Sequence, residues 1–194
     1  MATTTLDSEE LLHLAIKSSE AGQHEQSIDY LKRALEMDPK NADAQYMLGA
    51  EHAEIGLYDR AVEDMDKAVK LKPDLVTAHF QIGLLHITSG RIAEADAAWK
   101  PLDKLANDNP FYLFKEGLLH LVKDEFEDCI ALIEKGISLN KLNEPLNNDM
   151  RRILKEVFDR NPELKPESGD TESGKTTKTG KHMFLSAYQD KDDK

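Results

Sequence analysis

The strongest constraint on the fold of this chain is a repeat of 34 residues. Small residues return at that spacing from Ala15 and from Ser27, at positions 8 and 20 of each unit. The units are residues 8–41, 42–75, 76–109 and 110–143. The small residues are Ala15, Gly49, Gly83 and Gly117 at position 8, and Ser27, Ala61, Ala95 and Cys129 at position 20. Units this short must stack to bury their apolar residues, which predicts a solenoid.

Within each unit the pattern predicts two antiparallel helices. Apolar residues recur at intervals of three and four, which favours helices over strands. A glycine at position 15 in the first three units ends the first helix, and Asp124 stands there in the fourth. Pro39 and Pro73 end the second helix, while small residues at positions 8 and 20 let the two helices approach closely. The expected fold is therefore all-α, with about four helix-turn-helix repeats.

The rest of the chain departs from the repeat. Pro101 lies inside the second helix of the third unit and predicts an irregular exit from it. Residues 144–160 carry one apolar face and predict a helix that caps the last repeat. Residues 161–194 are rich in Pro, Ser, Gly, Thr and charged residues, which predicts a disordered tail. That tail contains an apolar motif at residues 182–189.

The second unit resembles the tetratricopeptide repeat (TPR) family. The residues that carry the resemblance are Leu48, Gly49, Gly56, Tyr58, Ala61, Ala68 and Pro73. The resemblance covers residues 8–143, and the fourth unit departs from the pattern at Asp124 and Lys141. It implies stacked helix pairs that bind a protein or peptide on a concave surface.

By the same resemblance, positions 2, 5, 9 and 12 of the first helix line a groove. The predicted groove residues are Leu12, Ile16, Tyr46, Ala50, Phe80, Leu84, Ile87, Phe114, Leu118 and Leu121. These side chains are apolar or aromatic, so the expected ligand is an apolar peptide segment. Family members that clamp acidic C-termini use Lys, Asn and Arg, which positions 5 and 9 lack here. Deeper burial or self-association of these residues stays open as an alternative.

The sequence therefore predicts a non-catalytic interaction module that acts as an adaptor or a client chaperone. Its size, acidity and apolar groove are similar to those of bacterial class II secretion chaperones, so a bacterial origin is expected. The alternative is a structural scaffold or oligomerising subunit that assembles a larger complex through its edges and its C-terminal motif.

Composition and charge exclude several other classes. The 37 acidic and 25 basic residues give a net charge of -12, which disfavours nucleic acid as a partner. No run approaches the ~18 apolar residues that cross a bilayer, and the first residues do not resemble a signal peptide. We therefore expect no membrane insertion and a cytoplasmic location.

Three patterns suggest chemistry but favour a structural interpretation. Residues 169–176 match the phosphate-loop pattern without the strand and helix that such a loop requires. Position 11 holds His52, His86 and His120, one in each of three units, which favours separate structural roles over a metal site. Cys129 stands at the small packing position 20. No catalytic residue, metal or cofactor is expected.

The apolar motif in the tail is predicted to be a docking motif. Its residues are Met183, Phe184, Leu185 and Tyr188, and a charged segment follows them. The motif would dock either in the groove of its own chain or on a second protein. A third interpretation, an apolar patch without a role, stays open.

Overall fold

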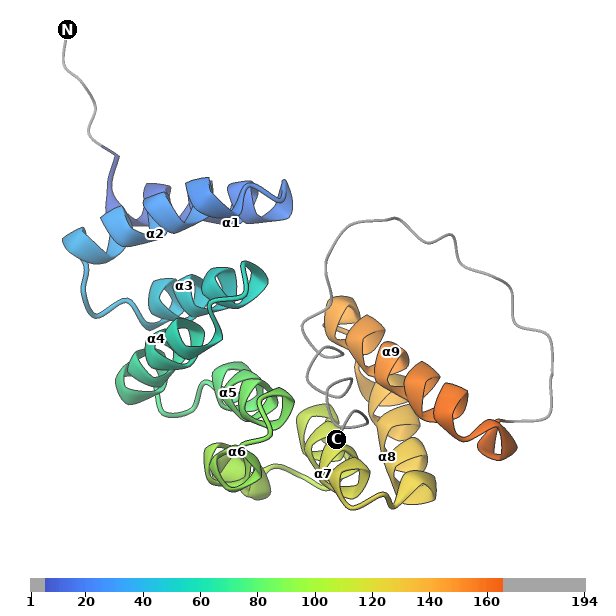
Figure 1. Cartoon of the computed structure of the whole chain (residues 1–194). Helices are drawn as coiled ribbons and strands as arrows, with labels where there is room; N and C mark the ends of the chain where they lie inside the picture. The colour runs from blue at the N-terminus through green and yellow to red at the C-terminus, as the bar shows by residue number, and fades with distance from the viewer. Residues whose placement is uncertain (1–5, 166–194) are drawn as a thin grey trace, which may run out of the picture. The chain divides into compact units, whose positions relative to one another are not determined.

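The computed structural model describes residues 6–165 of the 194-residue chain, and helices build this part (Figure 1). The α-helices are α1 (Ser8–Glu20), α2 (His24–Met37), α3 (Ala42–Glu54), α4 (Tyr58–Leu71), α5 (Val76–Thr88), α6 (Ile92–Trp99), α7 (Pro110–Val122), α8 (Phe126–Leu139) and α9 (Glu144–Arg160). Two 3-10 helices are η1 (Lys100–Lys104) and η2 (Pro162–Leu164). The all-α class predicted from the sequence is confirmed. The phosphate-loop pattern at 169–176 and the apolar motif at 182–189 lie outside the described residues.

The described chain divides after Pro101 into two compact units. Unit 1 contains residues 6–101, and unit 2 contains residues 102–165. The boundary falls where α6 ends after 8 residues, whereas α4 runs for 14. Pro101 has no backbone N–H to donate, so the α-helix cannot continue through it and η1 follows instead. The irregular exit predicted from Pro101 is confirmed.

In unit 1, the second and third pairs of helices pack closely at a glycine of their first helix. A Cβ on Gly49 would lie 2.7 Å from Cγ of Met65 and 2.9 Å from the carbonyl oxygen of Ala61. A Cβ on Gly83 would overlap the indole ring of Trp99. These approaches are shorter than normal van der Waals contact, so position 8 requires glycine in these two pairs.

The turns between paired helices share one backbone conformation. Gly22, Gly56 and Gly90 have φ of +70°, +79° and +71°. Asp124 has φ of +61° at the matching place in unit 2, although it has a side chain. Aspartate tolerates this left-handed region better than most residues do, which explains how the fourth pair turns without glycine.

Unit 2 consists of the α7–α8 pair with α9 packed against α8. α9 buries Leu146, Met150, Leu154 and Val157 along one side, as the amphipathic pattern of this segment predicts. The turn before α9 is fixed by Asn140 and Asn147, whose side chains hydrogen-bond each other at 2.9 Å. Asn147 also donates to the Asn140 carbonyl oxygen at 2.9 Å.

Candidate protein-binding face

The first-helix face of repeats 1 and 2 keeps partly accessible apolar side chains. Leu12, Ile16, Tyr46 and Ala50, which are predicted to line the groove, are half-buried. Leu12 packs against a buried cluster that includes Ala15. The face therefore combines a fixed apolar base with surface that a partner can still cover.

Tyr46 lies near the next repeat. Burial raises the pKa of Tyr46 above its usual value, and the side chain of Thr77, at position 2 of α5, lowers it in part. Thr77 is not among the predicted groove residues, although position 2 was assigned to the groove.

The structure buries two groove residues predicted in repeat 3. Phe80 is 0% exposed and Leu84 is 2% exposed. The ring of Phe80 stacks on Trp99, with ring centroids 5.9 Å apart and an interplanar angle of 22°. Trp99 Nε1 also donates a 2.9 Å hydrogen bond to the Phe80 carbonyl oxygen. Phe80 therefore packs within its own repeat, contrary to the prediction that it faces an open groove.

Two predicted groove residues in unit 2 are buried as well. Phe114 is 0% exposed and Leu118 is 2% exposed. The ring of Phe114 lies against Gly136 of α8, where a Cβ would collide with it. Glycine at position 27 leaves space that the large ring fills, so Phe114 turns toward α8. Ile87 in unit 1 and Leu121 in unit 2, both at position 12, are half-buried.

A polar network inside repeat 2 was not predicted from the sequence. The buried Asp64 carboxylate accepts hydrogen bonds from Gln45 Nε2 at 2.9 Å and Lys67 Nζ at 2.8 Å. His52 Nδ1 lies 2.8 Å from the other oxygen of Asp64. The available signal was an aspartate at position 23, on the side of α4 that buries Ala61, Met65 and Ala68. The three partners satisfy a charge that would be costly to bury alone.

The three histidines at position 11 have separate environments. His52 pairs with Asp64, and His120 Nδ1 lies 2.6 Å from Glu125 Oε2. Nδ1 of His86 is buried without a hydrogen-bond partner among the described residues. Burial and the charge of Arg91 lower the pKa of His86. In the described part of the chain, no three His, Cys, Asp or Glu side chains lie close enough to hold a metal ion.

Lys115 is a buried lysine of unit 2. Its ammonium pairs with Asp103 of η1 and lies 2.7 Å from Glu116 Oε1. It also lies 5.1 Å from the centre of the Tyr112 ring. Burial disfavours its charge, but the hydrogen bonds that it donates to Asp103 and Glu116 outweigh burial and raise the pKa of Lys115. Lys115 is therefore a charged structural residue that joins α7 to η1.

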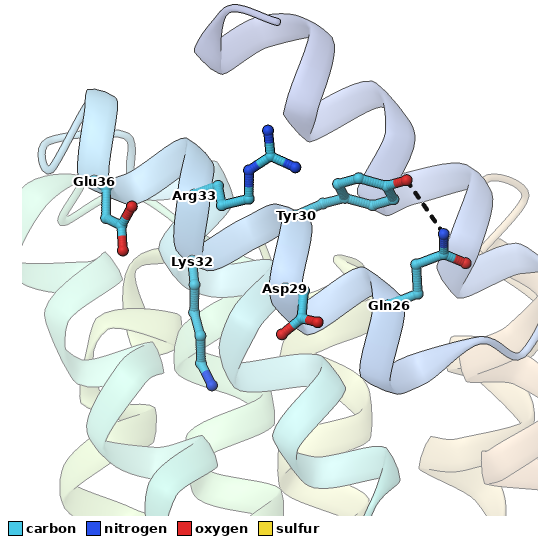
Figure 2. A pocket seen from close by; sticks show the side chains of 6 residues that line it. All are labelled: Gln26, Asp29, Tyr30, Lys32, Arg33 and Glu36. Carbon is cyan, nitrogen blue, oxygen red and sulfur yellow. Dashed lines mark hydrogen bonds between the residues drawn. The ribbon is translucent and has the colours of Figure 1, made fainter. Parts of the chain in front are cut away.

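A shallow pocket on α2 does not assemble reactive groups. Figure 2 shows its side chains spreading from one helix toward different sides rather than meeting at a point. Gln26 Nε2 donates a 3.2 Å hydrogen bond to the Tyr30 hydroxyl, and charges of both signs stand beside them. The lining residues are Gln26, Asp29, Tyr30, Lys32, Arg33 and Glu36. This arrangement is a solvated helix surface without a nucleophile and base in contact.

Two further observations concern reactivity and membranes. Cys129 is buried, and burial raises the pKa of its thiol to about 12. The thiol is therefore protonated and inert at neutral pH. No helix in the described part of the chain is both long and apolar enough to cross a bilayer.

Comparison with known proteins defines the class to which this fold belongs. The family model of the tetratricopeptide repeat matches residues 19–76. Together with the repeat spacing and the paired helices, this match shows that residues 19–76 carry tetratricopeptide repeats. No curated protein sequence is significantly similar to the chain.

Solved structures share the fold at low identity. A crystal structure of MamA is 20% identical, with a TM-score of 0.58 over 71% of this chain and 81% of that one. Residues 41 to the end of MamA from Desulfovibrio magneticus RS-1 are 17% identical, with a TM-score of 0.58 over 82% of this chain and 97% of that one. One chain of the crystal structure of the APC/C hetero-tetramer Cut9–Hcn1 is 18% identical, with a TM-score of 0.70 over 80% of this chain and 30% of that one. These similarities establish the fold alone.

Proposed function

We propose that the chain is a non-catalytic protein-binding module that holds an apolar peptide segment of a partner against the first-helix faces of its repeats. Tetratricopeptide repeats serve as protein-interaction scaffolds, and one similar structure is the Cut9–Hcn1 assembly. An adaptor or client-chaperone role follows from this mode of binding.

The observation that carries the proposal is the half-buried apolar row on the first helices. Leu12, Ile16, Tyr46 and Ala50 occupy positions 5 and 9 of successive repeats, and none carries a charge. An uncharged ridge of this kind gains free energy when a peptide covers it, at about 25 cal/mol per Å² of apolar area. The loss of peptide freedom offsets part of that gain.

Burial changes which residues serve as contacts. Phe80 and Phe114 support the first helices from inside their repeats. The proposed contacts in unit 1 are therefore Leu12, Ile16, Tyr46, Ala50 and Ile87. Leu121 is the half-buried counterpart in unit 2.

The test compares the same substitution on two faces of unit 1. Ala50→Glu places a charge on the half-buried first-helix face, whereas Ala97→Glu places it on an exposed part of α6. Peptides selected from a random library on the wild-type chain are titrated into each variant by calorimetry. We expect Ala50→Glu to weaken binding at least tenfold and Ala97→Glu to leave it unchanged. Equal affinities for the two variants contradict the proposal, provided that both retain wild-type circular dichroism.

A scaffold function is the second candidate, and one exposed leucine favours it. Leu142 is 99% exposed in the turn that Asn140 and Asn147 fix, and the nearby Leu139 is also exposed. A rigid turn that displays an apolar side chain suits an edge contact with another protein. Sedimentation velocity of Leu142→Ser against wild type tests it, because loss of a larger species in the variant supports assembly through this edge.

A further inference from the structure

The open sides of α1 and α3 carry the same pattern of residues. Positions 2, 6, 9 and 13 of the repeat are separated by four, three and four residues, so they share one side of a helix within about 60°. In that order they are Glu9, His13, Ile16 and Glu20 in α1, and Asp43, Met47, Ala50 and Glu54 in α3. The end residues are exposed, and Ile16, Met47 and Ala50 are half-buried. Each helix therefore presents an apolar centre between two accessible carboxylates.

The two rows form one surface because α1 and α3 lie side by side. Ala15 of α1 and Leu48 of α3 belong to one buried cluster, and Leu12 and Met47 pack against it from the two helices. Helices that pack together have axes about 8–10 Å apart. The apolar centres of α1 and α3 are therefore neighbours.

Carboxylates border this surface at both ends of the two helices. Glu9 and Asp43 form one acidic border, and Glu20 and Glu54 form the other. Positions 2 and 13 are 11 residues apart, so the two borders are separated by about 16 Å along the helices. At the same two positions α5 carries threonine, so within unit 1 the acidic borders are confined to repeats 1 and 2.

The acidic borders have little compensating positive charge. Lys72 Nζ lies 3.4 Å from Asp43 Oδ1, and both side chains are exposed. Glu9, Glu20 and Glu54 form no ion pair within residues 6–165. No Lys or Arg stands at positions 2, 5, 6, 9, 12 or 13 of α1 or α3. A cationic partner would therefore meet carboxylates that no described side chain neutralises, apart from Asp43.

We propose that this face binds a basic amphipathic helix of a partner protein, which lies across α1 and α3 with its apolar stripe on Ile16 and Ala50 and its Lys and Arg residues on the two acidic borders. The inference rests on the proposed function, because it names the class of partner for the same face. A helix is about 10–12 Å wide, and its lysine side chains extend further on both sides, which matches borders about 16 Å apart. Successive side chains of an extended strand point to opposite faces, so a strand does not place cations on both sides of one apolar stripe.

The acidic borders provide selectivity, and the apolar centre provides most of the affinity. One exposed ion pair changes affinity by less than about fivefold. Four such pairs formed together change it by about tenfold or more, whereas an acidic helix is repelled at both borders. The face is therefore expected to select basic over acidic apolar helices.

The first experiment compares three synthetic peptides on the full-length wild-type chain. The probe is a Leu/Lys peptide of about 14 residues, long enough as a helix to cross α1 and α3, with a leucine stripe between two rows of lysine. In the second peptide Glu replaces every Lys, and in the third a central proline prevents a continuous helix. By calorimetry at about 0.15 M salt, we expect the Leu/Lys peptide to bind at least tenfold more tightly than either control. Its circular dichroism should show helix gained on binding.

The second experiment removes the acidic borders. The border variant carries Glu9→Gln, Glu20→Gln, Asp43→Asn and Glu54→Gln. The control variant removes the same number of charges from exposed sites of the second helices, through Glu25→Gln, Glu36→Gln, Glu63→Gln and Asp96→Asn. Distant charges are screened beyond about 8 Å at this salt concentration. We therefore expect the border variant to bind the Leu/Lys peptide at least tenfold more weakly than wild type, and the control variant less than threefold more weakly.

Three results overturn the inference. Equal losses in the border and control variants would show attraction to net charge alone. Equal affinity of the Leu/Lys and Leu/Glu peptides would show that the borders do not select, and tight binding of the proline peptide would show an extended occupant. Each result can occur while Ala50→Glu still weakens the binding of library-selected peptides, so the proposed function would stand. The proposed function itself fails if Ala50→Glu leaves those peptides unaffected.

Discussion

Replacing Gly83 with alanine tests how closely the third helix pair packs. The added Cβ would overlap the indole of Trp99, which is 1% exposed and donates a hydrogen bond to the Phe80 carbonyl oxygen. Alanine improves helix propensity by about 1 kcal/mol. Overpacking opposes it by about 1–3 kcal/mol, and loss of the buried hydrogen bond by about 1–3 kcal/mol more. We therefore expect a net loss of about 3 kcal/mol in the free energy of unfolding of unit 1.

The measurement is urea unfolding of Gly83→Ala, followed by circular dichroism and by the fluorescence of Trp99, the single tryptophan of the chain. Gly49→Ala is the matched control. Its Cβ would meet Met65 Cγ at 2.7 Å and the Ala61 carbonyl oxygen at 2.9 Å, which is a milder overlap than the one with the Trp99 indole, so we expect a smaller loss. The double variant Gly83→Ala, Trp99→Leu should lose less stability than the two single variants together, by at least about 1 kcal/mol. Because this variant has no tryptophan, its unfolding is followed by circular dichroism alone. A Gly83→Ala variant as stable as wild type would refute the close packing described for α5 and α6.

Three other predictions follow from single side chains. Gly56→Ala should destabilise unit 1 by about 1 kcal/mol in thermal melts through its φ of +79° alone, because nothing lies within 4 Å of the added Cβ. Cys129 should react with a thiol reagent at pH 8 at least about 100-fold more slowly in the folded chain than in urea, and rapid labelling of the folded chain would contradict its burial. The lowered pKa of His86 means that unit 1 loses stability as pH falls below the ordinary histidine pKa of ~6.5. Ala98→Asp, at the position that matches Asp64, should raise the NMR titration midpoint of His86, and an unchanged midpoint would disprove that alignment.

The repeat architecture was accessible from the sequence because it depends on local rules. Small residues such as Gly49 and Gly83 stand where two helices approach most closely, and glycine marks each positive-φ turn in unit 1. Pro101 identified the interrupted helix because a missing N–H acts within one turn. These signals depend on the backbone, and the repeat presents each one several times.

The binding face was less predictable because side-chain direction depends on the facing helix. Phe114 turns toward α8 because Gly136 leaves space there, and Phe80 turns toward Trp99. Repeat position alone assigned both to the groove. The burial of Asp64 could not be predicted either, because it depends on Gln45, His52 and Lys67, which meet at Asp64 from two helices. Pairings of this kind are set by packing between helices and not by the spacing along one of them.

The central claim is that an apolar peptide covers the first-helix face, and methyl NMR tests it most directly. A library-selected apolar peptide is added to the full-length chain with labelled Ala, Ile and Leu methyl groups. We predict shifts at Ala50 and Ile87, which are half-buried on that face of unit 1, and none at Ile92, which is more exposed, or at Leu139. Shifts at Ile92 and Leu139 without shifts at Ala50 and Ile87 would show that the peptide binds elsewhere, and would contradict the claim.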